Sequence, residues 1–265
     1  MNPYFWSTFT INPMKIVISP AKSLDFESPI LEVKSTQPAF LKESKIINKV
    51  IKPKKPADLA ALMSISDKLA ELNWQRNKVW KTPFTTDNAR PSVFAFVGDV
   101  YIGLDVKTLS VEKMPLLQER LRILSGLYGI LKPLDLMQPY RLEMGTAIAI
   151  NDSKNLYDFW KVKLTSALNK ELKKGELLIN LASNEYFSAL DVKSLKVPVI
   201  TPEFKDYKDG NLKMISFFAK KARGMMVRYI IETNAETIED LKGFNYEGYC
   251  FDANLSKGNK LVFTR

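Results

Sequence analysis

The chain has 265 residues and a formal net charge of +10, with 39 Lys and Arg against 29 Asp and Glu. It has no histidine and one cysteine. This excludes Ser-His-Asp and Cys-His catalysis, histidine metal sites, internal disulfides, and thiolate zinc or iron–sulfur centres. No metal or cofactor is predicted, and any metal would need the oxygen ligands that Mg, Ca or Mn prefer.

The positive charge has two interpretations of equal weight. A polyanionic partner would account for it, and so would a lysine-rich composition that reflects no partner at all. No apolar run is long enough to span a bilayer, so no membrane is expected as a partner. A single cysteine fits a reducing cytoplasm.

The first 13 residues differ in composition from the rest of the chain. Residues 1–13 carry no charged side chain and so lack the basic start of a secretory signal. A strand-like run follows directly after Met14. We therefore expect either that Met14 is the natural start or that residues 1–13 are a loosely ordered extension, with one domain over 14–265.

Strand and helix patterns mix along the whole length, with no linker, repeat or low-complexity segment. This predicts a single α+β (mixed α/β) domain, with two lobes around a cleft as a variant. In chain order, the patterns predict a strand at 15–19, helices at 38–50, 56–63 and 66–79, a strand at 93–97, helices at 107–114, 115–126 and 155–173, strands at 177–181, 197–200 and 212–218, a helix at 219–233, and a hairpin of 247–252 with 260–264.

The segment 120–145 carries the most distinctive local pattern. A predicted helix runs into a turn with Gly126 and Gly129, and the basic side chains around that turn are Arg120, Arg122, Lys132 and Arg141. Such a turn can present backbone N–H groups and cations to phosphate, as helix-hairpin-helix motifs do. Two residues separate these glycines, unlike the usual hairpin. On spacing alone, a glycine helix cap followed by a proline loop is therefore favoured.

Polar side chains follow two predicted strands at their carboxyl ends, where α/β sheets bind ligands. Lys22 follows strand 15–19 and is suited to a phosphate or, if desolvated, to Schiff-base chemistry. Glu185 follows strand 177–181. Glu185 and Asp99 are the best candidates for a carboxylate that acts as a general acid or base. The alternative for Lys22 is a solvated loop lysine.

Three cations, Lys220, Lys221 and Arg223, open the predicted helix 219–233. Cations at a helix start oppose the helix dipole, and this local conflict favours a role in phosphate binding over an ordinary solvated face. Gly224 beside them would allow a backbone to approach closely.

Two further sets of polar residues each have two interpretations. Arg141 and Glu143 are either an internal ion pair that holds a loop or an acid and a base lining a cleft. The other set consists of four tyrosines. They could stack on unpaired bases, but tyrosines among apolar neighbours are usually core residues. They are Tyr101, Tyr128, Tyr140 and Tyr186.

Eight blocks of sequence follow one another along the chain: ISPAKSLD at 18–25, ISDKLA at 65–70, GDVY at 98–101, LSGLYG at 124–129, DLMQPYRLEMG at 135–145, NLASNEYF at 180–187, FAKKARG at 218–224 and GFNYEGY at 243–249. Together they resemble the YaaA family of bacterial peroxide-stress proteins. The resemblance runs from Met14 to the C-terminus and leaves residues 1–13 outside it.

The resemblance implies a cytoplasmic protein, induced by hydrogen peroxide, that limits oxidative DNA damage. It is linked to lowered free iron, to DNA binding and to recombinational repair. It also implies a family-specific mixed α/β fold with a basic cleft and a helix-hairpin-helix element. That expectation shifts the preferred interpretation of residues 120–133 to such an element.

We therefore predict a DNA-binding protein of the peroxide response that holds duplex, bubble or junction DNA in a basic cleft. The predicted contacts are Lys22, Lys68, Arg122, Lys132, Arg141, Lys220, Lys221 and Arg223, with Gly126 and Gly129 in the hairpin. The alternative is an enzyme acting on nucleic acid or a nucleotide, with Lys22, Glu185 and Arg223 in its site. Direct iron sequestration is disfavoured because few ligands other than carboxylates are present. No protein partner can be inferred.

Overall fold

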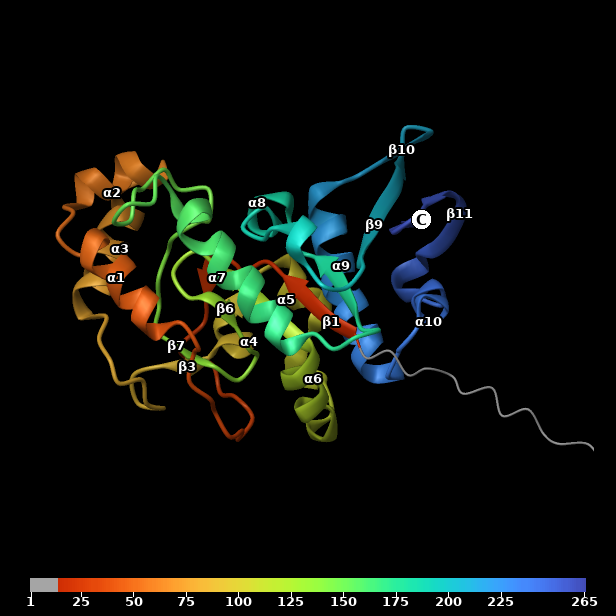
Figure 1. Cartoon of the computed structure of the whole chain (residues 1–265), viewed down its shortest axis with the longest axis horizontal. Helices are drawn as coiled ribbons and strands as arrows, with labels where there is room; N and C mark the ends of the chain where they lie inside the picture. Colours follow the sequence, from red (N-terminus) through yellow and green to blue (C-terminus); the bar gives the residue numbers. More distant parts are fainter. Residues whose placement is uncertain (1–13) are drawn as a thin grey trace, which may run out of the picture.

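A sheet with a parallel middle forms the centre of the computed structural model (Figure 1). Strand β1 (Met14–Ile18) lies between β5 (Leu121–Ser125) and β8 (Leu177–Leu181), parallel to both. Beyond β8 the parallel part continues with β9 (Val199–Lys208) and then β12 (Lys260–Thr264). Strands buried on both faces are rich in apolar residues, and four of the five residues of β1 are apolar. The fifth, Lys15, is also buried, and its Nζ donates to the carbonyl of Glu119 at 2.9 Å.

Antiparallel strands close both edges of this sheet. Strand β6 (Gly129–Leu131) pairs with β5 at one edge, and β11 (Cys250–Lys257) pairs with β12 at the other. Strand β10 (Asn211–Lys213) folds back on β9 as a hairpin. The predicted mixed α/β class, the strand at 177–181 and the final hairpin are confirmed.

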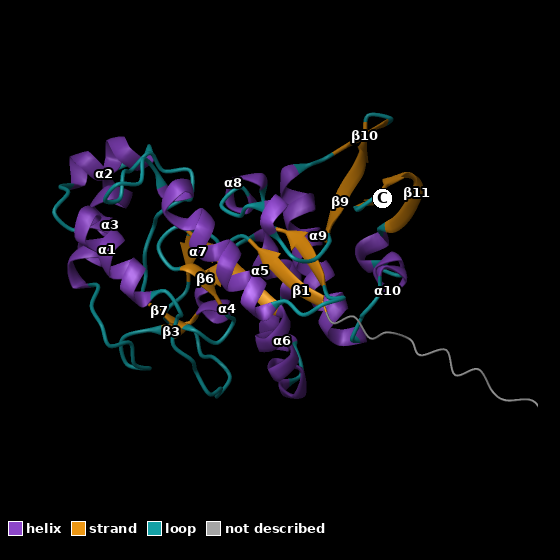
Figure 2. Ribbon diagram, in the orientation of Figure 1, coloured by secondary structure: helices purple, strands orange, loops and turns teal. Residues whose placement is uncertain are grey.

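The helices fall into two sets: some lie close to the sheet, and three others form a separate group. Helices α1 (Leu41–Ile51), α2 (Pro56–Met63) and α3 (Asp67–Val79) lie together at one end of the molecule (Figure 2). The long helices α7 (Leu156–Glu171) and α9 (Ser216–Thr233) lie nearer the sheet. The short elements are β2 (Ser23–Leu24), β3 (Arg90–Pro91), α4 (Ser92–Ala95), β4 (Phe96–Val97), α5 (Asp99–Leu104), α6 (Met114–Arg120), β7 (Leu136–Met137), α8 (Asn184–Phe187) and α10 (Ile238–Lys242).

The structure describes residues 14–265. The expectation that residues 1–13 are an extension before the natural start lies outside this range. None of the helices in the described range is long and apolar enough to cross a bilayer.

The helix expected at 107–114 is two short 3-10 helices, Val106–Thr108 and Val111–Lys113. Three further predicted elements are wrong in type. The helix expected at 115–126 ends at Arg120, where the chain enters β5. The strand expected at 93–97 is the one-turn helix α4 followed by the short β4. The strand expected at 212–218 stops at Lys213, and α9 begins at Ser216. In each of these three cases a short apolar run fits both the helical and the strand periodicity. Contacts with distant parts of the chain then decide which structure forms.

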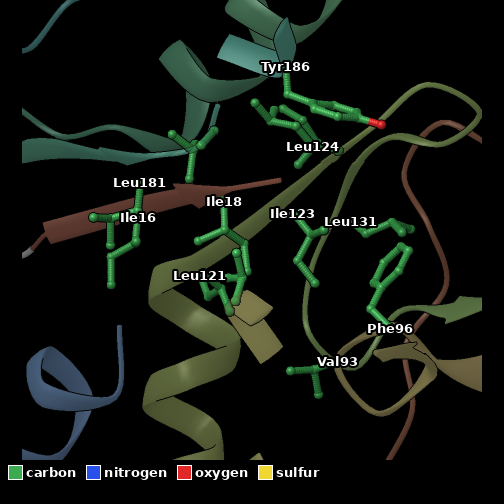
Figure 3. Close-up of a cluster of buried hydrophobic side chains, with 14 of the residues drawn as sticks. Ile16, Ile18, Val93, Phe96, Leu121, Ile123, Leu124, Leu131, Leu181 and Tyr186 are labelled. Carbon is green, nitrogen blue, oxygen red and sulfur yellow. The ribbon is translucent and has the colours of Figure 1, made fainter. Parts of the chain in front are cut away.

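The largest buried cluster lies on both sides of β1. Ile16 and Ile18 of β1, together with Leu121 and Ile123 of β5, are fully buried. Figure 3 shows them packed with side chains from α4, β4 and the segment after β8. Because β1 pairs with strands on both sides, this core fixes the carboxyl ends of β1, β5 and β8 next to one another.

Helices α5 and α9 cross at a contact that only glycine permits. A Cβ on Gly224 would lie 1.8 Å from the carbonyl oxygen of Val100, and one on Gly103 would lie 2.0 Å from that of Lys221. The close approach predicted for Gly224 therefore occurs, and the partner is the backbone of α5. This crossing sets the start of α5 beside the second and third turns of α9.

We expect Gly224→Ala to lower the free energy of unfolding by about 1–3 kcal/mol, the range for overpacked sites. The gain in helix propensity, about 1 kcal/mol, offsets only part of the cost of separating the two helices. Urea denaturation measures the difference. The control is Ser166→Ala, an exposed site on α7 where the expected change is within about 0.5 kcal/mol. An unchanged urea midpoint for Gly224→Ala would contradict the tight crossing.

Candidate functional site

A cavity of about 410 Å³ opens at the carboxyl ends of β1 and β8. The chain pairs β1 with β5 on one side and with β8 on the other, which makes this the point where the strand order reverses. Ligands of open α/β sheets bind at such points. Five of the predicted site residues line the cavity: Lys22, Asp99, Glu185, Lys220 and Arg223.

Four different elements position these five side chains. Lys22 lies in the loop after β1, and Glu185 lies on α8, which follows β8. Asp99 is the first residue of α5. Lys220 and Arg223 lie in the second and third turns of α9, which the glycine crossing holds against α5. The prediction that these cations open the helix is therefore wrong, because α9 already begins at Ser216, and the helix dipole acts mainly within the first turn.

Two serines join the strand ends at the base of the cavity. The backbone N–H of Ser183 donates to Oγ of Ser19 at 2.9 Å, and the two hydroxyls lie 3.2 Å apart. The hydroxyl of Tyr101 donates to the carbonyl of Ser19 at 3.1 Å. Sequence reasoning did not single out these serines, although each directly follows the apolar run of a strand. Their hydrogen bonds hold the two strand ends and α5 in a fixed arrangement.

A shared carboxylate forms one wall of the cavity. Oε1 of Glu143 lies 3.1 Å from the guanidinium of Arg141 and 3.4 Å from Nζ of Lys22. Oε2 of Glu143 and Nε of Arg141 are buried without a hydrogen-bond partner among the described residues. The ion-pair interpretation of Arg141 and Glu143 is therefore confirmed, and Glu143 also lines the cavity. Glu185 is fixed separately, by accepting from the backbone N–H of Gly145 at 3.0 Å.

The other wall carries charges that have no ion-pair partner in the described part of the chain. Within residues 14–265, neither Lys220 nor Arg223 has a carboxylate oxygen within 4 Å or a side-chain hydrogen bond. Asp99 likewise has no side-chain partner in that range. Burial lowers the pKa of the half-buried Arg223 guanidinium, partly opposed by Glu203, yet an arginine remains charged at neutral pH. Such unneutralised cations can bind an anionic ligand.

The remaining predicted cations lie elsewhere. Arg122 is buried and bonded to Glu171, with Nε to Oε2 at 2.7 Å, and Lys132 lies 3.9 Å from the same glutamate. Lys221 forms an ion pair with Glu247. Lys68 is exposed in the first turn of α3. None of these four side chains lines the cavity.

The helix-hairpin-helix predicted at residues 120–133 is wrong, because this segment is the buried hairpin of β5 and β6. Gly126 is required by packing, since a Cβ there would lie 2.3 Å from the carbonyl oxygen of Leu142. Its own carbonyl accepts from Nε1 of Trp160 at 2.9 Å. Gly129 has a φ of +69° beneath the ring of Trp160. These glycines therefore serve the core.

The tyrosines considered for base stacking are core residues. Tyr128 is fully buried, and Tyr101, Tyr140 and Tyr186 are at most 8% exposed. The hydroxyl of Tyr140 lies 2.7 Å from Oγ of Ser125. Burial raises the pKa of all four tyrosines, so they stay protonated at neutral pH. The core interpretation is therefore confirmed.

These features define a class of protein: a mixed α/β domain with a charged cavity at the reversal point of a mainly parallel sheet. No group of three or more His, Cys, Asp or Glu side chains in the described part of the chain could hold a metal ion.

Comparison with known proteins places the chain more closely. It matches the family model described as "Peroxide stress protein YaaA" over residues 14–255. The chain is 73% identical over 252 residues to a "UPF0246 protein" of Flavobacterium johnsoniae, a match that covers 95% of this chain and all of the relative. Relatives in Flavobacterium psychrophilum and Saccharophagus degradans are 67% and 54% identical, each over 95% of this chain and at least 99% of the relative. The chain belongs to the YaaA family of peroxide stress proteins.

The buried position of Arg122 predicts a structural effect of its removal. We expect Arg122→Met to lower the free energy of unfolding by roughly 3 kcal/mol, the lower end for breaking a buried ion pair, because Glu171 can still reach water. Thermal and urea unfolding measure this loss. If Arg122 instead contacts DNA phosphate, the variant will keep its stability, and the salt slope of DNA binding will fall by about one.

Proposed function

We propose that this protein binds DNA through its phosphate groups during the response to peroxide, with Lys22, Lys220 and Arg223 as the contacts. The observation that carries the proposal is the convergence of these three cations on one cavity, two of them without a carboxylate partner in the described range. Family membership supports the link to peroxide stress. Protection of DNA from oxidative damage in the cytoplasm would follow from such binding.

Electrostatics favours a phosphate over a neutral ligand at this position. A half-buried guanidinium has lost part of its hydration, and an anion can recover that loss by charge-assisted hydrogen bonds. Arg223 can bind two phosphate oxygens at once, whereas Lys220 acts as a single point charge one turn away. The overall charge of +10 would add attraction at longer range. An effect on free iron would be indirect, because the proposal includes no iron site.

We expect Arg223→Ala to weaken binding of duplex DNA roughly tenfold, as the loss of one charge-assisted hydrogen bond would. The slope of log K against log salt should become less steep by about one, and Lys220→Ala should lower it similarly. Fluorescence anisotropy at several salt concentrations measures both quantities.

The matched control is Lys45→Ala, which removes an exposed charge on α1. It should leave the affinity within about twofold. Equal losses in Lys45→Ala and Arg223→Ala would mean that binding follows total charge and that the cavity is not the contact site.

A second candidate function rests on the carboxylates of the same cavity. Asp99 and Glu185 line this cavity together with Lys22 and Arg223. A site that only binds phosphate does not require acidic side chains, so these two carboxylates need another explanation. Carboxylates beside cations are the groups that general acid–base catalysis at a phosphorylated substrate uses. This supports the alternative of an enzyme acting on nucleic acid or a nucleotide.

Lys22→Ala distinguishes the two functions. For a DNA-binding protein we expect a modest loss of affinity, about threefold, because the side chain is mostly exposed and already paired with Glu143. For an enzyme, DNA or nucleotide incubated with the native protein would change chemically. The variant would then lose turnover while it keeps binding. Gel shifts, followed by mass spectrometry of the recovered nucleic acid, report on both.

A further inference from the structure

The β9–β10 hairpin and the start of α9 hold large apolar side chains in solvent. Tyr207 is 65% exposed, Phe217 is 54% exposed and Met214 is 49% exposed. Figure 1 shows the hairpin extending beyond the rest of the fold. Single exposed apolar residues need no explanation, but a group of them on a projecting element marks an interaction surface.

The aromatic rings at the base of this surface are anchored. The guanidinium of Arg265 lies over the ring of Phe218, 4.8 Å from its centroid, and is itself bonded to Asp206 at 2.6 Å. The ring of Phe217 packs edge-on against Phe218, with centroids 5.6 Å apart. Phe217 is thus supported from one side while much of its ring faces water. A ring held in place loses little entropy when a partner stacks on it.

The charge of the same segment selects the partner. Residues 207–221 contain four lysines and one acidic residue, Asp209. Lys208, Lys213 and Lys220 are exposed, with no carboxylate oxygen within 4 Å in residues 14–265. Exposed rings among unneutralised cations fit a polyanion that presents flat apolar faces. Unpaired nucleotides have this chemistry, whereas the bases of a duplex are already stacked on each other.

The aromatic surface also adjoins the cavity. Phe217 and Lys220 lie three residues apart on α9, so their side chains are neighbours, and Lys220 and Arg223 line the cavity. A strand whose phosphates reach Lys220 and Arg223 would therefore bring its adjacent bases to Phe217.

We propose that Tyr207, Met214 and Phe217 form a stacking surface for the unpaired bases of single-stranded DNA. This inference rests on the proposed DNA binding and adds a second class of contact to it. The cavity would hold phosphates, and the hairpin with the start of α9 would hold bases. The protein would then favour DNA with an unpaired segment over an uninterrupted duplex.

The test compares a fluorescein-labelled thymidine oligonucleotide of about 15 nucleotides with a blunt duplex of the same length, by anisotropy at fixed salt. Phe217→Ala should weaken oligonucleotide binding about tenfold, since stacking on one side chain contributes about that much. Duplex binding should change less than twofold. Phe217→Trp should retain binding, and fluorescence of the added indole should be quenched by the oligonucleotide. Val162→Ala, an exposed apolar residue on α7, is the control and should bind like the native protein.

The outcomes separate the two proposals. If the native protein binds neither DNA, both proposals fail. If it binds duplex while Phe217→Ala leaves oligonucleotide binding unchanged, the stacking surface is overturned and the cavity proposal stands. A shift from dimer to monomer in Phe217→Ala, with unchanged oligonucleotide binding, would assign the surface to self-association and also overturn it.

Discussion

The pairing of β1 on both sides determines where the site can form. Its five buried residues pair in parallel with β5 and with β8, so three strand ends arrive at one edge of the sheet. The loop after β1 delivers Lys22 to that edge, and the turn after β8 delivers Glu185. The serine contacts between these two strand ends then fix their separation. The cavity is a consequence of this topology, and the close crossing of α5 and α9 supplies its remaining charges.

The cavity holds a nearly balanced set of charges with an uneven distribution of partners. Glu143 pairs with both Arg141 and Lys22 on one wall and offsets one of their two positive charges, while Lys220, Arg223 and Asp99 stay unpartnered within the described residues. Uncompensated groups in a half-buried position reduce stability, and proteins keep them where they serve a ligand. If the cavity binds phosphate as proposed, the carboxylates beside the cations would limit how many phosphates could enter, because each acid repels an anion. A ligand with one phosphate near α9 and hydrogen-bond donors near Asp99 and Glu185 would satisfy both sets.

Local sequence patterns predicted the elements that local forces determine. Helix α2 was predicted with its exact bounds because Pro56 fixes its first turn, and β8 because a short apolar run follows a glycine. Strand β5 was missed because its leucines also fit helical spacing, and only pairing with β1 selects the strand. The strand-end argument found Lys22 and Glu185, whereas Lys220 and Arg223 were singled out by a helix-start argument that is wrong because α9 begins at Ser216. Their convergence depends on contacts between distant segments, which no single segment encodes.

Burial was the property that the charge pattern could not predict. Arg122 and Lys132 flank glycines in the sequence as a phosphate-binding hairpin would require, yet Arg122 belongs to an ion pair in the interior. The same holds for the tyrosines, whose rings are buried; the hydroxyl of Tyr140, for example, lies 2.7 Å from Oγ of Ser125. Residue type alone cannot distinguish a solvated cation from a paired one, because both occur beside apolar runs.

The position of β1 at the centre of the sheet also has a consequence for how the chain acquires its structure. Ile16 is synthesised early, but its partners Leu121 and Ile179 emerge from the ribosome much later. Until then an apolar strand with two open edges has nothing to pair with, and contacts of such long sequence separation form slowly. Partly synthesised chains with exposed apolar strands aggregate readily. Before β5 and β8 are made, the unpaired β1 is therefore a segment through which partly synthesised chains could associate.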